Sequence, residues 1–189
     1  MLLIRQAAVY APEYLGVRDV LVCGGVIEAV EEQIEGELPF CKVIDGRGKK
    51  LTPGFIDPHV HITGGGGEGS FHTQVPPVKL SELLQGGVTS LVGLLGTDGI
   101  SRNMESLLAR GKALKEEGLT VYLCTGSYGY PSVTLTGDIR KDIMFVEEII
   151  GVKLALSDHR APNVTLDELV RLASDARVAG MLSGKCGMI

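Results

Sequence analysis

The residues with the clearest chemical potential lie in one apolar stretch, Leu51–Ile62, which holds two histidines two positions apart. On an extended strand, alternate side chains share a face, so Asp57, His59 and His61 would point to the same side. The opposite side would carry Pro58, Val60 and Ile62. Neutral imidazole binds zinc, iron, nickel or manganese, so the two rings could reach one ion. Two partly exposed histidines on a strand would have the same spacing, and the pattern alone leaves both interpretations open.

A lysine inside a second apolar run is the next candidate. Lys153 lies within 149–156, where a charged ammonium is costly to bury unless it is neutralised or paired. Alternation places Ala155, Ser157 and His159 on its face, and we expect that face to point toward the interior that His59 and His61 share. A neutral lysine amine can add carbon dioxide, and the resulting carbamate can bridge two metal ions. Alternatively, the ammonium extends to solvent or pairs with Asp57.

Four polar residues follow the expected strands and could bind a substrate. Glu68 follows Gly64–Gly67, and glycine allows unusual backbone turns and close approach to a ligand. Arg160 could hold a carboxylate with two parallel hydrogen bonds. Tyr128 could donate its hydroxyl to a carbonyl oxygen as charge develops there, and Thr97 is a weaker candidate for substrate contact. Each also has a plain structural interpretation, as a solvated loop carboxylate, a surface arginine or a packed ring.

The remaining histidines and the cysteines are not assigned to a site. His159 precedes Arg160 and could support the ligands from behind, whereas His72 lies in an expected loop and should be exposed. The cysteines are far apart in apolar sequence and are expected to be buried free thiols. They are Cys23, Cys41, Cys124 and Cys186.

These residues need a frame, and from Pro53 onward the sequence predicts alternating strands and helices. The expected strands are 54–62, 89–95, 119–124 and 152–157, and the expected helices are 79–85, 102–117, 138–149 and 165–178. Four parallel βα units make about half of an eight-unit barrel of roughly 250 residues. The predicted fold class is therefore α/β, a partial TIM (β/α) barrel over 53–189, and the chain ends where a fifth strand should begin.

Residues 1–52 predict a separate small β subdomain. Short strands flank Gly24–Gly25, a two-residue hairpin signal, and further strands flank 46–48. We expect an incomplete antiparallel, β-sandwich-like unit that joins the partial barrel directly near Thr52–Pro53.

Composition excludes several classes of function. The chain has 189 residues, 44% of them hydrophobic, and 18 basic against 23 acidic residues give a net charge of −5. This balance does not indicate binding to nucleic acid or to an anionic membrane. No apolar run reaches the roughly 18 residues of a membrane helix, and the first residues lack the features of a signal peptide. We expect a cytoplasmic protein.

Taken together, these motifs resemble those of the isoaspartyl dipeptidases, metal-dependent enzymes of the amidohydrolase superfamily. The resemblance runs from the first barrel strand to the last residue and corresponds to the N-terminal half of such an enzyme. The segments that carry it are Leu51–Ile62, Gly64–Glu68, Gly93–Asp98, Thr125–Tyr128 and Lys153–Arg160.

The resemblance implies hydrolysis of the isoaspartyl (β-aspartyl) bond of a dipeptide by a metal-bound hydroxide. It implies that His59, His61 and a carboxylated Lys153 hold two divalent metal ions, with zinc favoured. It also implies that the substrate's α-ammonium binds a carboxylate, that a substrate carboxylate binds an arginine, and that a tyrosine acts on the scissile carbonyl. The residues that match these substrate-binding roles are Glu68, Thr97, Tyr128 and Arg160, of which Tyr128 is also catalytic.

The family also needs two further histidines and an aspartate general base from strands five, six and eight, which this sequence does not contain. The chain could be part of a longer enzyme, a truncated product with little activity, or one of two chains that share a site. As alternatives, it could be an inert metal-binding or assembly fragment, or a cyclic amidohydrolase like dihydropyrimidinase or dihydroorotase. A half-barrel exposes strand edges and apolar faces, so we expect association, most simply as a homo-oligomer.

Overall fold

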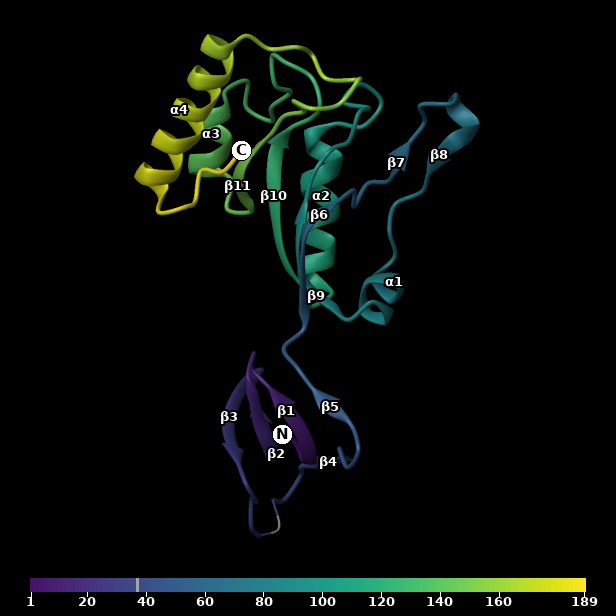
Figure 1. The fold of residues 1–189 in the computed structure, drawn as a ribbon, viewed down its shortest axis with the longest axis vertical. Coiled ribbons are helices and arrows are strands. Elements are labelled where there is room, and N and C mark those ends of the chain that lie inside the picture. The colour runs from purple at the N-terminus through teal and green to yellow at the C-terminus, as the bar shows by residue number, and fades with distance from the viewer. Residues whose placement is uncertain (37) are drawn as a thin grey trace. The chain divides into compact units, whose positions relative to one another are not determined.

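The computed structural model describes residues 1–36 and 38–189, which divide into two compact units, Met1–Gly54 and Phe55–Ile189 (Figure 1). The sequence placed this boundary two residues earlier, after residue 52. Within the part of the chain that the structure describes, no helix combines the length and apolar character needed to cross a membrane.

The first unit is a single five-stranded sheet. Its strands are β1 (Leu2–Tyr10), β2 (Tyr14–Cys23), β3 (Val26–Glu31), β4 (Lys42–Asp45) and β5 (Lys50–Leu51), in the order β3-β2-β1-β4, with β5 also on β1. The pairs β1–β2 and β2–β3 are antiparallel, as predicted, and Gly24 and Gly25 turn the β2–β3 hairpin with φ of 58° and 82°. At the other edge β4 and β5 pair with β1 in parallel, so the sheet is mixed.

The second unit confirms the partial barrel. Its main sheet contains β6 (Phe55–Val60), β9 (Val88–Gly93), β10 (Thr120–Gly126) and β11 (Ile149–Lys153), all parallel, in the order β11-β10-β9-β6. The helices are α1 (Leu80–Gln85), α2 (Met104–Glu116), α3 (Ile139–Phe145) and α4 (Leu166–Ser183). Because spatial order follows chain order, the four units wind like the first half of a (β/α)8 barrel.

The helices pack on one face of this sheet, and their apolar residues form its core. The largest fully buried side chains there include Ile62, Leu91, Leu95, Met104, Leu107, Leu114, Leu123, Ile143, Ile149, Leu172 and Val152. The predicted capping box begins α4: Glu168 N donates to Thr165 Oγ1 at 3.3 Å, and Thr165 N donates to Glu168 Oε2 at 2.8 Å.

The predicted boundary between α3 and β11 is wrong. The sequence predicted a helix that runs to residue 149 and a strand that begins at 152. In the structure, α3 ends at Phe145 and β11 is Ile149–Lys153. Lys185 Nζ donates to the carbonyl oxygens of Ile143, Val146 and Ile149 at 2.7, 2.5 and 3.0 Å, which satisfies the end of the helix. As a consequence, Ala155, Ser157 and His159 lie beyond the strand, and alternation along it stops at Lys153.

The last residues pair with β11, at the place that a fifth strand would occupy. Gly151 and Met188 form a parallel bridge, Val152 N donates to Met188 O at 2.8 Å, and Gly187 N donates to Ile150 O at 3.0 Å. A side chain at Gly151 would place its Cβ 2.3 Å from Met188 Cγ, so glycine permits this approach.

Candidate functional site

The predicted site residues all lie at or beyond the carboxyl ends of the four parallel strands. His59 lies on β6, and Lys153 ends β11. The other five lie in the segments that follow β6, β9, β10 and β11: His61, Glu68, Thr97, Tyr128 and Arg160. The carboxyl ends of parallel barrel strands meet at one face, which is where barrel enzymes have their active sites.

The two histidines of the predicted pair lie together. Their ring centroids are 5.4 Å apart and their planes are inclined by 76°. Simple alternation is only part of the reason, because the pairing of β6 with β9 is irregular between Asp57 and Val60, and the strand ends before His61. The buried side chain of Ile62 and the partly buried side chain of Val60 pack into the core. This anchoring directs the histidines to the other side.

One nitrogen of His61 has a defined role. Its Nδ1 lies 3.3 Å from the carbonyl oxygen of Leu94, which can only accept, so Nδ1 carries the hydrogen. The lone pair therefore lies on Nε2, where it can bind a metal ion. Gly96 makes room for the ring, since a Cβ there would lie 3.0 Å from His61 Cε1.

The pKa of both imidazoles is lowered, which favours the neutral form that metal binding requires. Burial lowers the pKa of His59, and the positive charge of Lys153 lowers it further. Burial also lowers the pKa of His61, and Lys153 adds to this, although the hydrogen bond to Leu94 opposes it. Metal ligands must give up their proton, so these shifts favour binding.

Lys153 is half-buried beside the same site. Burial lowers the pKa of its amine, which enlarges the neutral, reactive fraction. Its Nζ lies 5.2 Å from the ring centroid of Tyr128. The amine is near enough to both imidazoles for its charge to lower their pKa values. That the three groups hold metal ions together stays a prediction.

These donors suit a metal ion but do not complete a site. Two neutral imidazoles and an amine of lowered pKa are a suitable donor set for a divalent transition metal. Among the described residues, however, no three histidine, cysteine, aspartate or glutamate side chains lie close enough together to hold one. A catalytic zinc ion has three protein ligands, so the two ions that the resemblance implies would need more donors than His59, His61 and Lys153 provide.

A charged cluster lies next to Lys153. Arg160 Nη1 donates to Glu68 Oε1 at 2.7 Å, and Thr97 Oγ1 donates to the same oxygen at 3.2 Å. The Arg160 guanidinium carbon lies 5.1 Å from the Tyr128 ring centroid. Contacts therefore link all five of these residues, from Thr97 through Glu68, Arg160 and Tyr128 to Lys153.

Asp158 holds the arginine in this position. Arg160 Nε and Nη2 donate to the two carboxylate oxygens of Asp158 at 2.8 and 2.6 Å. The hydrogen bonds from Arg160 keep the pKa of Asp158 well below its usual range. By contrast, His159 does not share the face of Lys153, contrary to prediction. Its side chain is 88% exposed, because the chain has already left the strand.

The glycine run before Glu68 is an ordered hairpin. Strand β7 (Gly65–Gly66) pairs with β8 (Gln74–Val75), and the 3-10 helix η1 (Phe71–Thr73) closes the loop with His72 exposed, as expected. At Gly64, with φ of 90°, a Cβ would lie 2.2 Å from Val75 O. The glycine is therefore required by the close backbone contact that positions Glu68.

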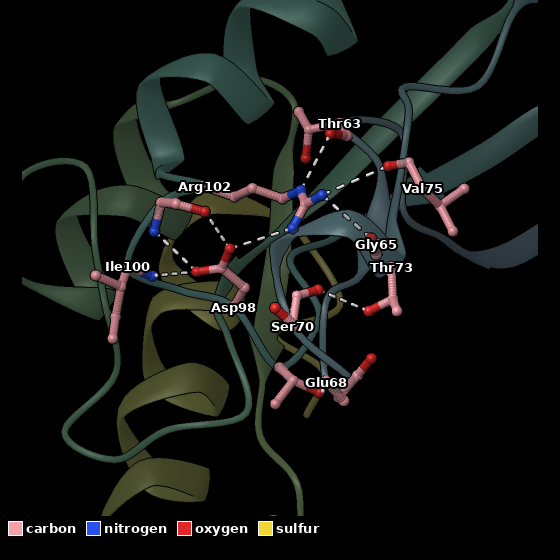
Figure 2. A network of polar contacts seen from close by, with 11 residues as sticks. Thr63, Gly65, Glu68, Ser70, Thr73, Val75, Asp98, Ile100 and Arg102 are labelled. Atoms are coloured by element: carbon pink, nitrogen blue, oxygen red, sulfur yellow. Dashed lines mark hydrogen bonds and ion pairs between the residues drawn. The ribbon is translucent and has the colours of Figure 1, made fainter.

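The sequence analysis missed Arg102, which fastens this hairpin (Figure 2). Its Nε donates to Thr63 O at 3.3 Å, and its Nη2 donates to Gly65 O at 3.1 Å and to Val75 O at 3.5 Å. Its Nη1 donates to Asp98 Oδ2 at 3.2 Å. The only sequence signal was an arginine just before a helix, which is typical of a solvated residue.

Asp142 is a second missed residue, and it organises the loop that carries Tyr128. The fully buried carboxylate accepts hydrogen bonds from Thr125 Oγ1 at 2.5 Å, from Leu135 N at 2.8 Å and from Thr136 N at 2.9 Å. These contacts fold 126–137 back onto β10, because a buried carboxylate needs several donors.

Two solved structures resemble this chain over nearly its whole length. The β-aspartyl dipeptidase of the thermophilic, keratin-degrading Fervidobacterium islandicum AW-1 is 48% identical, with a TM-score of 0.92 over 97% of this chain and 50% of that one. The same enzyme in complex with the β-Asp-Leu dipeptide is 47% identical, with a TM-score of 0.89 over 97% of this chain and 48% of that one. The present chain thus spans about half the length of these enzymes, which confirms the predicted resemblance to an N-terminal half.

Sequence comparison identifies the wider family. The dihydroorotase of Elusimicrobium minutum is 36% identical over 98 residues, which are 51% of this chain and 22% of that enzyme. The model of the amidohydrolase family matches residues 51–183, which covers the partial barrel almost completely. With this match and the strand order of the sheet, the chain belongs to the amidohydrolase family.

Proposed function

We propose that this chain supplies the N-terminal half of the active site of a metal-dependent isoaspartyl dipeptidase. The observation that carries the proposal is the pairing of Glu68 with Arg160 at 2.7 Å, directly beside Tyr128 and Lys153. An isoaspartyl dipeptide has an ammonium and two carboxylates. One anionic and one cationic side chain at the mouth of a metal site suit such a ligand.

His59, His61 and Lys153 would hold two divalent ions, for which we propose zinc. When bound, the ions would lower the pKa of water and polarise the scissile carbonyl. Two features support this: the lowered pKa of both imidazoles favours their neutral form, and the contact of His61 Nδ1 with Leu94 O leaves the lone pair on Nε2. The neutral amine of Lys153 would form a bond to carbon dioxide and lose a proton, which turns it into a bridging carbamate.

The remaining residues would bind and orient the substrate. Glu68, supported by the hydroxyl of Thr97, would hold the α-ammonium, and Arg160 would hold a carboxylate. The Tyr128 ring contacts both Lys153 and Arg160, and its hydroxyl would donate to the carbonyl oxygen as negative charge develops.

The test compares hydrolysis of β-Asp-Leu with that of α-Asp-Leu by the zinc-loaded protein at its natural length. We expect cleavage of the β-linked peptide alone, and a loss of at least about 100-fold in kcat on replacing Tyr128 with phenylalanine. Glu147→Gln is a suitable control, because Glu147 is an exposed carboxylate that pairs with Lys115. Equal cleavage of both peptides would refute the proposal.

Dihydroorotase activity is the second candidate, and the sequence match to a dihydroorotase favours it. A cyclic ureide with one carboxylate offers Arg160 a partner but leaves Glu68 without a cation. Assays with dihydroorotate and hydantoin beside β-Asp-Leu would decide between these substrates. Bound metal with no turnover of any of the three would instead indicate an inert metal-binding fragment.

A further inference from the structure

We propose that the Glu68–Arg160 ion pair couples recognition of the substrate's ammonium to recognition of its carboxylate, so that the site selects zwitterionic ligands. This inference rests on the proposed function, since it takes these two residues as the binding groups. In addition, Glu68 and Arg160 each occupy the other's binding position until a ligand with both charges arrives.

The pair joins distant parts of the chain. Glu68 follows the β7 strand and Arg160 follows β11, 92 positions later in the sequence. Two of the three guanidinium nitrogens of Arg160, Nε and Nη2, donate to Asp158, and the third, Nη1, donates to Glu68. A ligand carboxylate that approaches Nη1 must therefore compete with Glu68.

The same competition holds for Glu68. Its Oε1 accepts from both Arg160 and Thr97, so an incoming ammonium must displace the arginine to gain the full charge of the carboxylate. The side chains of Arg160 and Glu68 are 31% and 43% exposed. A small ligand can thus reach the pair from solvent.

Three kinds of ligand then behave differently. A ligand with neither charge leaves the pair intact. A ligand with one charge breaks the pair and leaves the displaced residue without this contact, although Arg160 keeps its hydrogen bonds to Asp158. A ligand with both charges breaks the pair once and gives each partner a replacement, so the coupling between the two charges equals the strength of the pair. For a partly exposed ion pair this is about fivefold in affinity.

The experiment measures binding of four forms of a ketomethylene analogue of β-Asp-Leu by calorimetry, using the zinc-loaded protein at its natural length. The amine is either free or acetylated, and the carboxylates are either free or amidated. We expect acetylation to weaken binding about fivefold more when the carboxylates are free than when they are amidated. In Glu68→Gln this difference should fall below about twofold, and in the matched exposed control Glu147→Gln it should persist.

The inference would be overturned if, in the unmodified protein, acetylation and amidation together changed the affinity by the product of their separate effects, within twofold. Coupling that survives in Glu68→Gln would overturn it as well. Failure of all four analogues to bind would overturn it too. Hydrogen exchange of residues 64–75 in the ligand-free protein gives an independent readout, because loss of the pair in Glu68→Gln should speed exchange of the hairpin about fivefold. Unchanged exchange would count against the pair. Coupling without hydrolysis of β-Asp-Leu would support the inference while refuting the proposed reaction.

Discussion

Replacing Arg102 with methionine should loosen the hairpin that carries Glu68. Methionine keeps the apolar stem of the arginine but removes every donor. The guanidinium contacts Thr63 O at 3.3 Å, Gly65 O at 3.1 Å and Asp98 at 3.2 Å (Figure 2). These contacts join the end of β6, the hairpin and the loop after β9.

The magnitude follows from the contacts and their exposure. Each hydrogen bond to a neutral carbonyl contributes about 1 kcal/mol, and the charged contact with Asp98 contributes about 1.5–3 kcal/mol. The Arg102 side chain is only 12% exposed, so water can replace few of the hydrogen bonds that the substitution removes. Asp98 keeps hydrogen bonds from the backbone N–H groups of Ile100 and Ser101. We therefore expect a loss of about 4 kcal/mol in the free energy of unfolding.

Urea unfolding measures this loss, and hydrogen exchange locates it. Arg140→Met is the matched control, because Arg140 is 55% exposed and its two ion pairs are long, at 3.8 Å. The control should lose less than about 1 kcal/mol. Exchange of 64–75 should quicken in Arg102→Met only. If the two variants lose the same stability within about 1 kcal/mol, the guanidinium does not fasten the hairpin.

Three further predictions concern the site, the acid sensitivity of the fold and its association. Gly96→Ala would press a methyl group against the His61 ring, since the added Cβ would lie 3.0 Å from Cε1. The affinity for zinc, measured by competition with a chelator, should therefore fall about tenfold, with little change in the stability toward urea. Burial raises the pKa of Glu148, but the hydrogen bond from Lys112, a backbone hydrogen bond and the charges of Lys112 and Lys115 together outweigh this and hold the pKa below its usual 4.5. Its contribution to stability is therefore present above about pH 4.5 and is lost as the pH falls through the lower folded pKa, so the acid side of the stability curve should be flatter in Glu148→Gln. The edge of β6 carries exposed apolar side chains, Phe55 at 61% and Ile56 at 72%; residues 1–189 expressed alone should associate, and a monodisperse monomer in light scattering would contradict this.

Local patterns predicted most of the elements and the chemistry. Alternating apolar runs and glycine stops identified the four parallel strands, and the capping box at Thr165 identified the start of α4. The His-x-His spacing identified the pair at His59 and His61. Such signals are reliable because they depend on the backbone geometry of neighbouring residues alone.

The boundary between α3 and β11 shows where local patterns stop being informative. Residues 143–152 are apolar enough for a buried helix or a buried strand, and periodicity does not separate short runs of either kind. The tertiary structure decided the boundary, through strand pairing with β10 and through Lys185, which reaches back to the carbonyl groups of Ile143 and Val146.

The sequence by itself determined which chemical groups we assign to the candidate site, namely two imidazoles, an amine, a carboxylate, a guanidinium and a phenol. Only the tertiary structure decided that Glu68 and Arg160 touch, and that Arg102 and Asp158 hold them in place. The physical reason is that these contacts join loops whose positions depend on the register of the parallel strands beneath them. That register is fixed by packing of the whole core, to which no short segment of sequence corresponds.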